Sequence, residues 1–476
     1  MTKIIISNCI KIIEPTKEIK DFCKKQLEFK NPDYIKKQRM NFYVGKTPKV
    51  IKLYDNFEGT LYIPTGSFEQ LWKIHPYKDD YVDYTVSRPI KVKSSISLRE
   101  YQKPCIKALK EHYNGILNLP CGTGKTISAI ACVCELKERT LWIAGTIDLL
   151  NQAKETAETF TTLTTSMITE GKMDLSGQIV FSTPQSLLKF INNGEISQDE
   201  FGMVVNDECQ HISTNPNSIQ IYRTCFEYFA ARIKCGLTAT IWRSDGLQDC
   251  ILRIVGEPIY KMVQSGDVYK CIYNDETVLT VPIDKFQVPC KVKVIETNYN
   301  LEGKEVFAKN GGTIQFASLI NDIAMDVDRN NIIIQNLINI EGSTIILSDR
   351  VEQLKYLCSM VENGVEIDGS TPKKLRAKAL DDVRSGKVKY LFSSFALAKE
   401  GLNCPVLSNL ILATPVKGDT AVIQSCGRIQ RPFEGKTIAT VYDYVDKVGM
   451  LRNFYAKRRS IYRKNKWDIE NIYLGG

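Results

Sequence analysis

Short apolar runs alternate with stretches of helical character from Leu98 onward. The runs form two series, residues 115–119, 140–144, 178–182 and 202–206, followed by residues 343–347, 388–393, 407–414 and 437–441. Each run is bounded by polar or glycine-containing segments. Apolar strands that alternate with helices are typical of a parallel sheet with helices on both faces. The pattern therefore predicts an α/β fold with two parallel-sheet lobes.

The first 95 residues follow a different pattern, which predicts a small α+β domain. Strands are expected at residues 51–54 and 60–63, joined by a turn at residues 56–59, and a short helix at residues 68–74. Residues 256–322 are less regular and are expected to hold strands and a linker. The expected domains are residues 1–95 as an accessory substrate-binding domain, 96–255 as the first, ATP-binding lobe, 256–447 as linker and second lobe, and 448–476 as a basic tail packed on that lobe.

Composition narrows the class of protein only slightly. Hydrophobic residues make up 43% and charged residues 25% of the 476 residues, as in ordinary soluble globular proteins. The net charge of +9 favours a polyanionic partner. The 15 cysteines include no Cys-x-x-Cys pair and only 3 histidines accompany them, so a zinc finger lacks ligands. Reduced, mostly buried thiols are expected instead.

The N-terminus lacks the pattern of a signal peptide, and no apolar run approaches the roughly 18 residues that span a membrane. We therefore expect a soluble, cytoplasmic protein with no membrane partner. The abundance of Lys, Ile and Asn is compatible with a viral or phage genome, so the compartment expected is a bacterium or an infected host cell.

A glycine turn follows the first apolar run and opens a helix at Lys125. Its sequence is Pro120-Cys121-Gly122-Thr123-Gly124-Lys125-Thr126, although Leu119 stands where the full phosphate-loop pattern has glycine. Backbone N–H groups at such a helix start bind phosphate, and glycines let the backbone come close. We expect Lys125 to reach the β- and γ-phosphates of ATP and the Thr126 hydroxyl to hold Mg²⁺. The alternative is a tight strand–helix turn without a ligand.

An acidic pair, Asp207 and Glu208, follows the apolar run that ends at Asn206. An acid at the carboxyl end of a strand can complete a Mg²⁺ shell, and a second acid beside it can polarise the attacking water. An isolated Asp-Glu pair is usually a solvated loop, but here it follows a phosphate loop at a plausible distance. We therefore expect Asp207 to bind the metal and Glu208 to act on water.

Two further groups of polar residues are candidates for the same site. Arg99 and Gln102 precede the first core helix, and a glutamine can read both the donor and the acceptor of adenine. Arg428 and Arg431 are three residues apart, so we expect them to share a helix face and to stabilise charge on a transferring phosphoryl group. The alternatives are a solvated helix start and a surface helix with ordinary salt bridges.

Taken in order, these residues resemble the motifs of the superfamily 2 helicases over residues 98–431. The matching segments are Arg99 and Gln102 (Q-type motif), residues 120–126 (motif I), 141–152 (Ia), 182–184 (Ib), 207–210 (II), 238–240 (III), 344–348 (IV), 393–405 with Gly401 (V) and 424–431 (VI). The chain looks most similar to the phage and XPB-like group, including phage branch-migration enzymes and the poxvirus transcript-release helicase. It departs from the common pattern at Gln210, Ile241 and Asn403.

The resemblance implies two tandem RecA-like lobes and one ATP site that uses ATP and Mg²⁺. Catalysis would fall to Lys125, Asp207, Glu208, Gln424, Arg428 and Arg431, nucleotide binding to Arg99, Gln102, Gly122, Thr123, Gly124, Lys125, Thr126 and Gly401, and the metal to Thr126 and Asp207. Family analogy also places nucleic-acid backbone near Thr146, Thr183, Ser370 and Ser394, for which helix capping or a turn is an equally good explanation.

The function implied is that of an ATP-dependent DNA helicase or translocase that unwinds or branch-migrates DNA in repair or recombination. Forked or branched DNA is the partner expected, RNA is possible, and the protein is expected to be monomeric. Alternatives are a transcript-release or RNA-directed helicase and a non-enzymatic clamp with a relic ATP site. The tail from residue 451 carries seven Lys or Arg with interleaved aromatics, and we expect its charge to attract the nucleic-acid backbone and its aromatics to pack on the second lobe.

Overall fold

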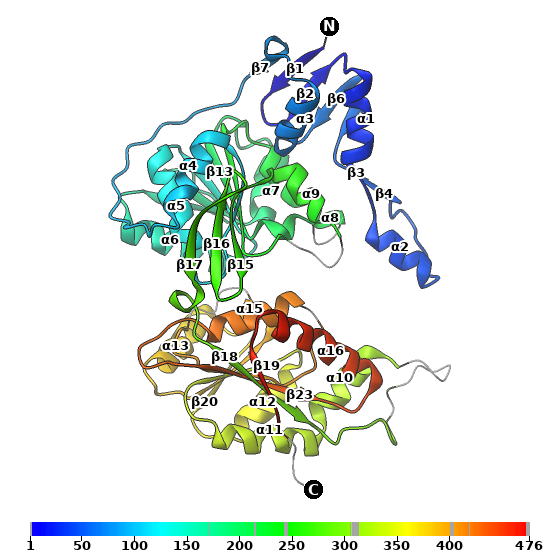
Figure 1. Ribbon diagram of the computed structural model, residues 1–476, viewed down its shortest axis with the longest axis vertical. Coiled ribbons are helices and arrows are strands. Elements are labelled where there is room, and N and C mark those ends of the chain that lie inside the picture. The colour runs from blue at the N-terminus through cyan, green and yellow to red at the C-terminus, as the bar shows by residue number, and fades with distance from the viewer. Residues whose placement is uncertain are drawn as a thin grey trace. The chain divides into compact units, whose positions relative to one another are not determined.

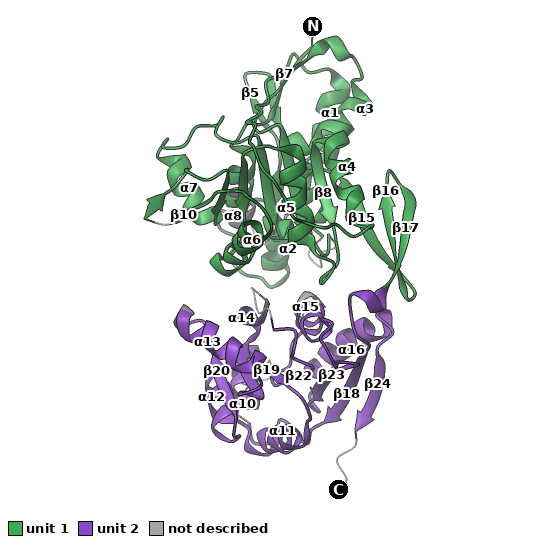
Figure 2. Ribbon diagram, turned by 90° about the vertical axis from the view of Figure 1, so that its left-hand side faces the viewer, with its two compact units in different colours: residues 1–282 green, residues 283–476 purple. Residues whose placement is uncertain are grey.

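The computed structural model divides the chain into two compact units, Met1–Pro282 and Ile283–Gly476 (Figure 2). It describes residues 2–169, 171–213, 216–241, 246–304, 306, 314–399, 404–417 and 419–472. Each unit is built around its own sheets and is described separately below.

The first unit begins with a small α+β domain (Figure 1). Its five-stranded sheet has the order β5-β6-β2-β1-β7. The strands are β1 (Lys3–Ile6), β2 (Ile10–Ile13), β5 (Asp55–Phe57), β6 (Thr60–Ile63) and β7 (Tyr81–Asp83), and the helices are α1 (Lys17–Gln26) and α3 (Phe68–Ile74), with short 3₁₀ turns at Thr65–Ser67 and Lys78–Asp80. A separate two-stranded sheet of β3 (Glu28–Lys30) and β4 (Val50–Lys52) carries α2 (Pro32–Arg39).

A ten-stranded sheet with the order β11-β10-β12-β9-β13-β14-β8-β15-β16-β17 forms the core of the first lobe. Its strands are β8 (Asn114–Asn118), β9 (Thr140–Ile143), β10 (Thr165–Thr169), β11 (Lys172–Met173), β12 (Ile179–Ser182), β13 (Met203–Asp207), β14 (Ile233–Thr238), β15 (Pro258–Ser265), β16 (Val268–Tyr273) and β17 (Glu276–Pro282). Its helices are α4 (Lys103–His112), α5 (Lys125–Leu136), α6 (Ile147–Phe160), α7 (Pro184–Asn192), α8 (Pro216–Glu227) and α9 (Gln248–Val255). Strands β10, β12, β9, β13, β14, β8 and β15 are parallel, so the loops at their carboxyl ends meet at one edge.

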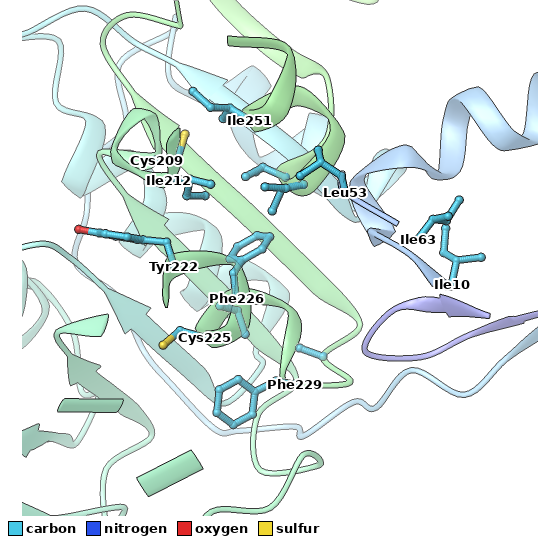
Figure 3. Packing of buried hydrophobic residues seen from close by; sticks show 14 of the residues in the cluster. Ile10, Leu53, Ile63, Cys209, Ile212, Tyr222, Cys225, Phe226, Phe229 and Ile251 are labelled. Carbon is cyan, nitrogen blue, oxygen red and sulfur yellow. The ribbon is translucent and has the colours of Figure 1, made fainter. Parts of the chain in front are cut away.

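The N-terminal domain packs directly on α8 and α9 of this lobe. Ile10, Leu53 and Ile63 belong to the same buried cluster as Phe226 and Ile251 (Figure 3). Gly66 lies so close to α9 that a Cβ atom there would stand 2.5 Å from the backbone nitrogen of Gly256. Backbone contact at this distance requires glycine, and it fixes the small domain against the lobe.

The second unit contains a seven-stranded sheet with the order β20-β21-β19-β22-β23-β18-β24, in which every pairing is parallel. Its strands are β18 (Cys290–Glu296), β19 (Thr344–Ser348), β20 (Gly364–Ile367), β21 (Tyr390–Ser394), β22 (Asn409–Leu412), β23 (Ala439–Val445) and β24 (Asp468–Ile472). Its helices are α10 (Phe316–Met325), α11 (Val327–Asn339), α12 (Val351–Ser359), α13 (Lys373–Arg384), α14 (Phe395–Lys399), α15 (Asp419–Ile429) and α16 (Gly449–Lys464).

The predicted fold class is confirmed: both lobes are α/β. The sheet of the second lobe is wholly parallel, and that of the first has a parallel centre extended by the antiparallel strands β11, β16 and β17. Each of the eight apolar runs overlaps a strand. The helix at residues 68–74 is also confirmed as α3. The predicted hairpin of residues 51–54 with 60–63 is wrong. β6 pairs with β5, whereas β4 pairs with β3, because residues 28–52 form a separate excursion from the sheet. In residues 256–322, where strands and a linker were expected, β15, β16 and β17 continue the sheet of the first lobe and β18 belongs to the sheet of the second.

All 15 cysteines are free thiols, and only Cys9, Cys121 and Cys358 are more than marginally exposed, as expected. Over the described residues, no helix is both long and apolar enough to cross a membrane.

Candidate functional site

The phosphate loop joins β8 to α5. α5 begins at Lys125, where the sequence predicts a helix start. Gly122 and Gly124 have backbone φ angles of +84° and +83°, which residues other than glycine rarely adopt. A Cβ atom at Gly124 would also lie 2.7 Å from Nε2 of Gln102. Thr123 Oγ1 donates to the Pro120 carbonyl at 2.7 Å, which closes the loop on itself. The loop therefore has the backbone shape that lets N–H groups at the amino end of α5 bind an anion.

Gln102 and Tyr101 together hold one carbonyl of this loop. Gln102 Nε2 and the Tyr101 hydroxyl both donate to the Thr123 carbonyl, at 3.1 and 2.9 Å. Gln102 Oε1 accepts from the Arg99 backbone N–H at 3.0 Å, and the Tyr260 hydroxyl donates to the Tyr101 carbonyl. Of the two predicted adenine-reading residues, Gln102 therefore contacts the phosphate loop directly, whereas Arg99 contacts Gln102 and Tyr101. Tyr101 was not among the residues predicted for the site, although its position between Arg99 and Gln102 is a signal that could have found it.

The acidic pair lies at the same edge of the sheet as the phosphate loop, because only β14 separates β13 from β8. Lys125 Nζ lies 2.7 Å from Glu208 Oε1 and donates to it. Glu208 has a positive φ of 53°, and its backbone N–H donates to Asp207 Oδ1 at 3.0 Å. A non-glycine residue in this region is uncommon and is frequently found at functional sites. The strained turn aims Glu208 at the lysine of the phosphate loop.

Burial and charge set the protonation of these three groups. Burial and, after it, the neighbouring Glu208 carboxylate raise the pKa of Asp207 to about 6, although the Lys125 ammonium acts in the opposite direction. Burial alone would raise the pKa of Glu208, but the Lys125 ammonium outweighs it and holds that pKa below its usual range. Burial likewise opposes the charge on Lys125, yet Glu208 keeps its pKa above the ordinary value. The three side chains thus form one electrostatic unit.

This unit continues through Gln210 to the end of β14. Gln210 Nε2 donates to Glu208 Oε2 at 2.5 Å, and Gln210 Oε1 accepts from the Thr238 hydroxyl at 2.6 Å. The Thr240 backbone N–H donates to Thr238 Oγ1 at 3.1 Å. A continuous chain of contacts therefore links the phosphate loop to the segment after β14. Gln210, one of the departures from the common motif, provides this bridge through its amide.

The residues expected to hold a metal are Asp207 and Thr126. Asp207 is almost wholly buried, while Thr126, the second residue of α5, is partly buried. Among the described residues, no group of three or more His, Cys, Asp or Glu side chains could hold a metal ion by itself. A carboxylate and a hydroxyl that leave the remaining positions to phosphate and water suit Mg²⁺.

In the second unit, Gln424 and Arg428 lie one turn apart on α15, and both are partly buried. The prediction that Arg428 and Arg431 share a helix face is wrong, because α15 ends at Ile429. Arg431 lies in the segment that follows, where Lys436 Nζ donates to its carbonyl at 2.9 Å and to that of Leu407 at 2.7 Å. Gly401 and Asn403 lie outside the described residues.

The four hydroxyl residues expected at the nucleic acid each have a local hydrogen bond. Thr146 and Thr183 cap α6 and α7 by accepting from the backbone N–H of Leu149 and Ser186, at 3.4 and 3.3 Å. Ser394 Oγ accepts from the Leu397 N–H at 3.3 Å. The fourth, exposed Ser370, donates to Asp368 Oδ1 at 2.7 Å. Capping and turn roles therefore account for the hydroxyls, and the backbone N–H groups at these loops are the remaining candidates for phosphate contacts.

The C-terminal tail is partly a core element. Arg458, one of its seven basic residues, is buried and donates twice to Asp443, at 2.9 and 2.7 Å. Tyr462 donates to the same carboxylate at 2.8 Å and stacks against Trp467. The expectation that the aromatics pack on the lobe is confirmed for Tyr462 and Phe454, but the charge of Arg458 is neutralised in the interior.

Family models and relatives agree with this arrangement. Residues 95–243 match the model described as type III restriction enzyme, res subunit, and residues 328–432 match helicase conserved C-terminal domain. D10 of Escherichia phage T5, named as a helicase, is 26% identical over 476 residues, which cover 98% of this chain and 95% of its own. L396 of Acanthamoeba polyphaga mimivirus, named as an ATP-dependent RNA helicase, is 26% identical over 382 residues, which cover 78% and 67%.

A shorter match, 31% identical over 170 residues, covers 36% of this chain and 37% of the DNA 3'-5' translocase XPB2 of Sulfurisphaera tokodaii. The solved structure of S. cerevisiae Dbp5 bound to RNA and ADP BeF3 superposes with a TM-score of 0.56 at 16% identity, over 79% of this chain and 89% of that one. At that identity the likeness concerns the fold alone, which is that of two tandem RecA-like lobes. The chain belongs to the superfamily 2 helicases, in the group of phage and XPB-like members, and is an ATP-hydrolysing enzyme that acts on nucleic acid.

Proposed function

We propose that the protein is a DNA helicase or translocase that couples ATP hydrolysis to unwinding or branch migration of DNA. The observation that carries this proposal is the continuous contact chain from Lys125 through Glu208 and Gln210 to Thr238. Such a chain gives the state of the nucleotide site a direct route to the segment beyond β14. A motor needs a link of this kind between its chemical step and a moving segment.

For the chemical step, we assign Lys125 to the β- and γ-phosphates and the loop glycines to close backbone approach. Thr123 shapes the loop through its bond to the Pro120 carbonyl. We assign Arg99 and Gln102 to the adenine base. Thr126 and Asp207 would hold Mg²⁺, which when bound neutralises charge on the phosphates. Asp207 is buried and close enough to Lys125, the first residue of α5, for each charge to shift the pKa of the other, which supports this assignment.

Glu208 has a role that changes with the nucleotide. Its carboxylate pairs with Lys125, so a triphosphate that binds the loop competes with it for the ammonium group. Once displaced, the carboxylate is available to orient water for attack on the γ-phosphate. In the second unit, Gln424, Arg428 and Arg431 are proposed to bind the transferring phosphoryl group, with Gly401 in the neighbouring motif; guanidinium groups suit that charge.

DNA is the substrate that we favour, in forked or branched form. The name of the XPB relative, a DNA 3'-5' translocase, supports it. RNA is the second candidate, because the mimivirus relative is named as an RNA helicase. Backbone contacts are proposed at the loops of Thr146, Thr183, Ser370 and Ser394. We further propose a cytoplasmic monomer in which residues 1–95 bind substrate and the first lobe binds ATP. That lobe extends past the expected boundary at residue 255 to Pro282, because β15, β16 and β17 continue its sheet. The expected tail, residues 448–476, contributes β24 to the sheet of the second lobe.

The decisive experiment is an ATPase and unwinding assay on a panel of forked DNA, four-way junctions, blunt duplex and duplex RNA. Wild-type protein should hydrolyse ATP fastest with branched DNA and should unwind or migrate it. The variants Lys125→Ala and Glu208→Gln should fail on every substrate. Equal stimulation by RNA and DNA would favour the RNA-directed alternative, and normal turnover in either variant would overturn the site.

A further inference from the structure

A basic projection interrupts the N-terminal domain between α1 and β5. It consists of residues 28–52, that is β3, α2, β4 and the loop between α2 and β4, and we call it the arm (Figure 1). No residue from Pro32 to Val50 is buried, and α2 has no buried residue at all. A helix that packs no face on a core gains little from the hydrophobic effect. The arm is therefore not explained by the stability of its own domain.

Polar contacts nevertheless give the arm a defined shape. Asn31 is buried, caps α2 by accepting from the Asp33 N–H at 3.0 Å, and donates from Nδ2 to the Pro48 carbonyl at 2.7 Å. Lys37 Nζ bridges Asp33 at 3.0 Å and Thr47 Oγ1 at 2.8 Å. These bonds tie the start and middle of α2 to Thr47 and Pro48, in the segment that leads into β4. The loop beyond α2 is thus presented in a fixed place rather than as a loose tether.

The end of the arm carries large apolar side chains in water. Met40, Phe42 and Tyr43 are 52%, 64% and 92% exposed. Gly45 follows with φ +51°, and a Cβ atom there would stand 3.2 Å from the Tyr43 ring. The turn at Gly45 therefore leaves room for the ring. Two adjacent exposed aromatics at the end of a projection are a typical surface for binding.

The charge of the arm identifies the class of partner. Residues 32–50 contain five basic residues, Lys36, Lys37, Arg39, Lys46 and Lys49, against the single acid Asp33. This net charge of +4 is nearly half of the +9 of the whole chain, concentrated in 19 positions. A basic surface that presents aromatic rings matches a polyanion that also offers flat apolar faces. Nucleic acid with unpaired bases has both properties.

We propose that the arm binds the branch point of the nucleic acid, with Phe42 and Tyr43 stacked on the first unpaired bases and the lysines on the flanking phosphates. Inside a duplex, neighbouring bases cover each base face, so stacking selects a fork or junction over continuous duplex. The inference rests on the proposed function, which it deepens by assigning to these residues the recognition of branched substrate. The double variant Phe42→Ala/Tyr43→Ala should then lose selectivity for branched DNA while keeping the ATP site.

The test uses full-length protein and forked DNA with 2-aminopurine either at the first unpaired position or inside the duplex arm. Phe57→Ala is the matched control, because Phe57 is a 66% exposed aromatic on edge strand β5 of the same domain. The double variant should bind the fork about tenfold more weakly than wild type, with little change on blunt duplex. It should also lose the fluorescence change at the first unpaired base, which the Phe57 control retains.

A second pair of variants separates stacking from charge. Lys46→Gln/Lys49→Gln should weaken fork and duplex binding alike and reduce the salt dependence, whereas the control Lys24→Gln/Lys25→Gln on α1 should do neither. Single-strand-stimulated ATPase should stay at the wild-type rate in every arm variant, so loss of fork recognition is distinguishable from failure of the ATP site. Unchanged fork affinity and fluorescence in a folded Phe42→Ala/Tyr43→Ala variant would overturn the proposal. The proposal would also be overturned if Phe42→Ala/Tyr43→Ala lost as much affinity for blunt duplex as for the fork.

Discussion

Lys125 Nζ and Glu208 Oε1 are 2.7 Å apart, so the lysine of the phosphate loop and the acid expected to act on water neutralise each other. Their side chains are only 12% and 19% exposed, which protects the pair from solvent screening. Neither group can perform its proposed task while this bond persists. We therefore propose that a bound triphosphate takes the place of Glu208 at Lys125 and so frees both groups for these tasks.

Replacing Glu208 by Gln should separate ATP binding from ATP hydrolysis. Without the carboxylate, Lys125 is released and the triphosphate meets less negative charge, so a fluorescent ATP analogue should bind about tenfold more tightly. Hydrolysis should fall by about 100-fold or more, because the group that orients water is lost. Stopped-flow binding and single-turnover hydrolysis measure the two effects.

Lys125→Ala is the companion variant with the opposite binding phenotype. It removes the cation that the phosphates need, so affinity and hydrolysis should both fall. If Glu208→Gln bound nucleotide as weakly as Lys125→Ala, the competition between triphosphate and Glu208 would be disproved.

Gln210→Ala should weaken the coupling between ATP hydrolysis and strand separation. It leaves Lys125 and Glu208 in place but removes the bridge from Glu208 to the Thr238 hydroxyl. DNA-stimulated ATPase should stay within a few-fold of wild type, while base pairs opened per ATP should fall. Because both side chains serve one bridge, Thr238→Val should add little to Gln210→Ala in a double-mutant cycle. Additive losses would show that the two residues act separately.

Most residues of the candidate site in the first lobe can be predicted from the sequence, because the backbone conformation there restricts which residue types can occupy each position. Gly122 and Gly124 need positive φ, and the acids must follow a buried strand, so each leaves a local signature. The Lys125–Glu208 pair and the Tyr101–Thr123 contact leave none, because they depend on which strands become neighbours in the sheet. In the sheet, β14 lies between β13 and β8. The order of the strands along the chain does not predict this arrangement.

Two predictions from local sequence patterns were wrong, because strand pairing and side-chain burial depend on tertiary contacts. Residues 51–54 have strand character, yet β4 pairs with β3 rather than β6, since the arm returns to its own start. The basic pattern of the tail also conceals Arg458, whose charge is buried against Asp443. A run of lysines and arginines does not show which of the side chains is buried in the core.

Arg431→Ala should abolish hydrolysis while leaving ATP binding nearly intact. A guanidinium that stabilises charge in the transition state contributes little to ATP binding in the ground state. Its removal should therefore lower the turnover number and leave the ATP affinity nearly unchanged. A reduction of about 100-fold or more is expected in single-turnover hydrolysis. Arg452→Ala, an exposed arginine on α16 of the same unit, is the control and should behave as wild type. Wild-type hydrolysis in Arg431→Ala would remove this residue from the ATP site.

Arg458 and its neighbour Arg459 should have opposite phenotypes. Arg458→Met leaves Asp443 as a buried charge without its bidentate partner, so the free energy of unfolding of the second unit should drop by about 3–5 kcal/mol. Arg459 is exposed, so Arg459→Met should leave stability unchanged and reduce the salt dependence of nucleic-acid binding. Chemical denaturation and salt titrations check the pair, and equal stability of the two variants would contradict a structural role for Arg458.

Lys234 should make the stability of the first unit depend on alkaline pH. Its side chain is buried on β14, where Nζ donates to the Asn8 carbonyl at 2.9 Å. Burial lowers the pKa of Lys234 to about 8, although Glu227 on α8 and the Cys9 thiol of the N-terminal domain favour its charged form. The unfolded chain keeps the ordinary value of 10.5, so between these values it binds more protons than the folded protein. Stability therefore rises with pH across this window.

The size of this effect follows from the shift. Each unit of pKa corresponds to about 1.4 kcal/mol, so up to about 3 kcal/mol of unfolding free energy should be gained between pH 8 and 10.5. Other lysines, tyrosines and thiols titrate in the same range, and the comparison with Lys234→Met removes their contribution. The difference in unfolding free energy, wild type minus variant, should become more favourable to wild type as pH rises. A difference that stays flat from pH 7 to 10.5 would mean that Lys234 remains fully charged in the folded protein.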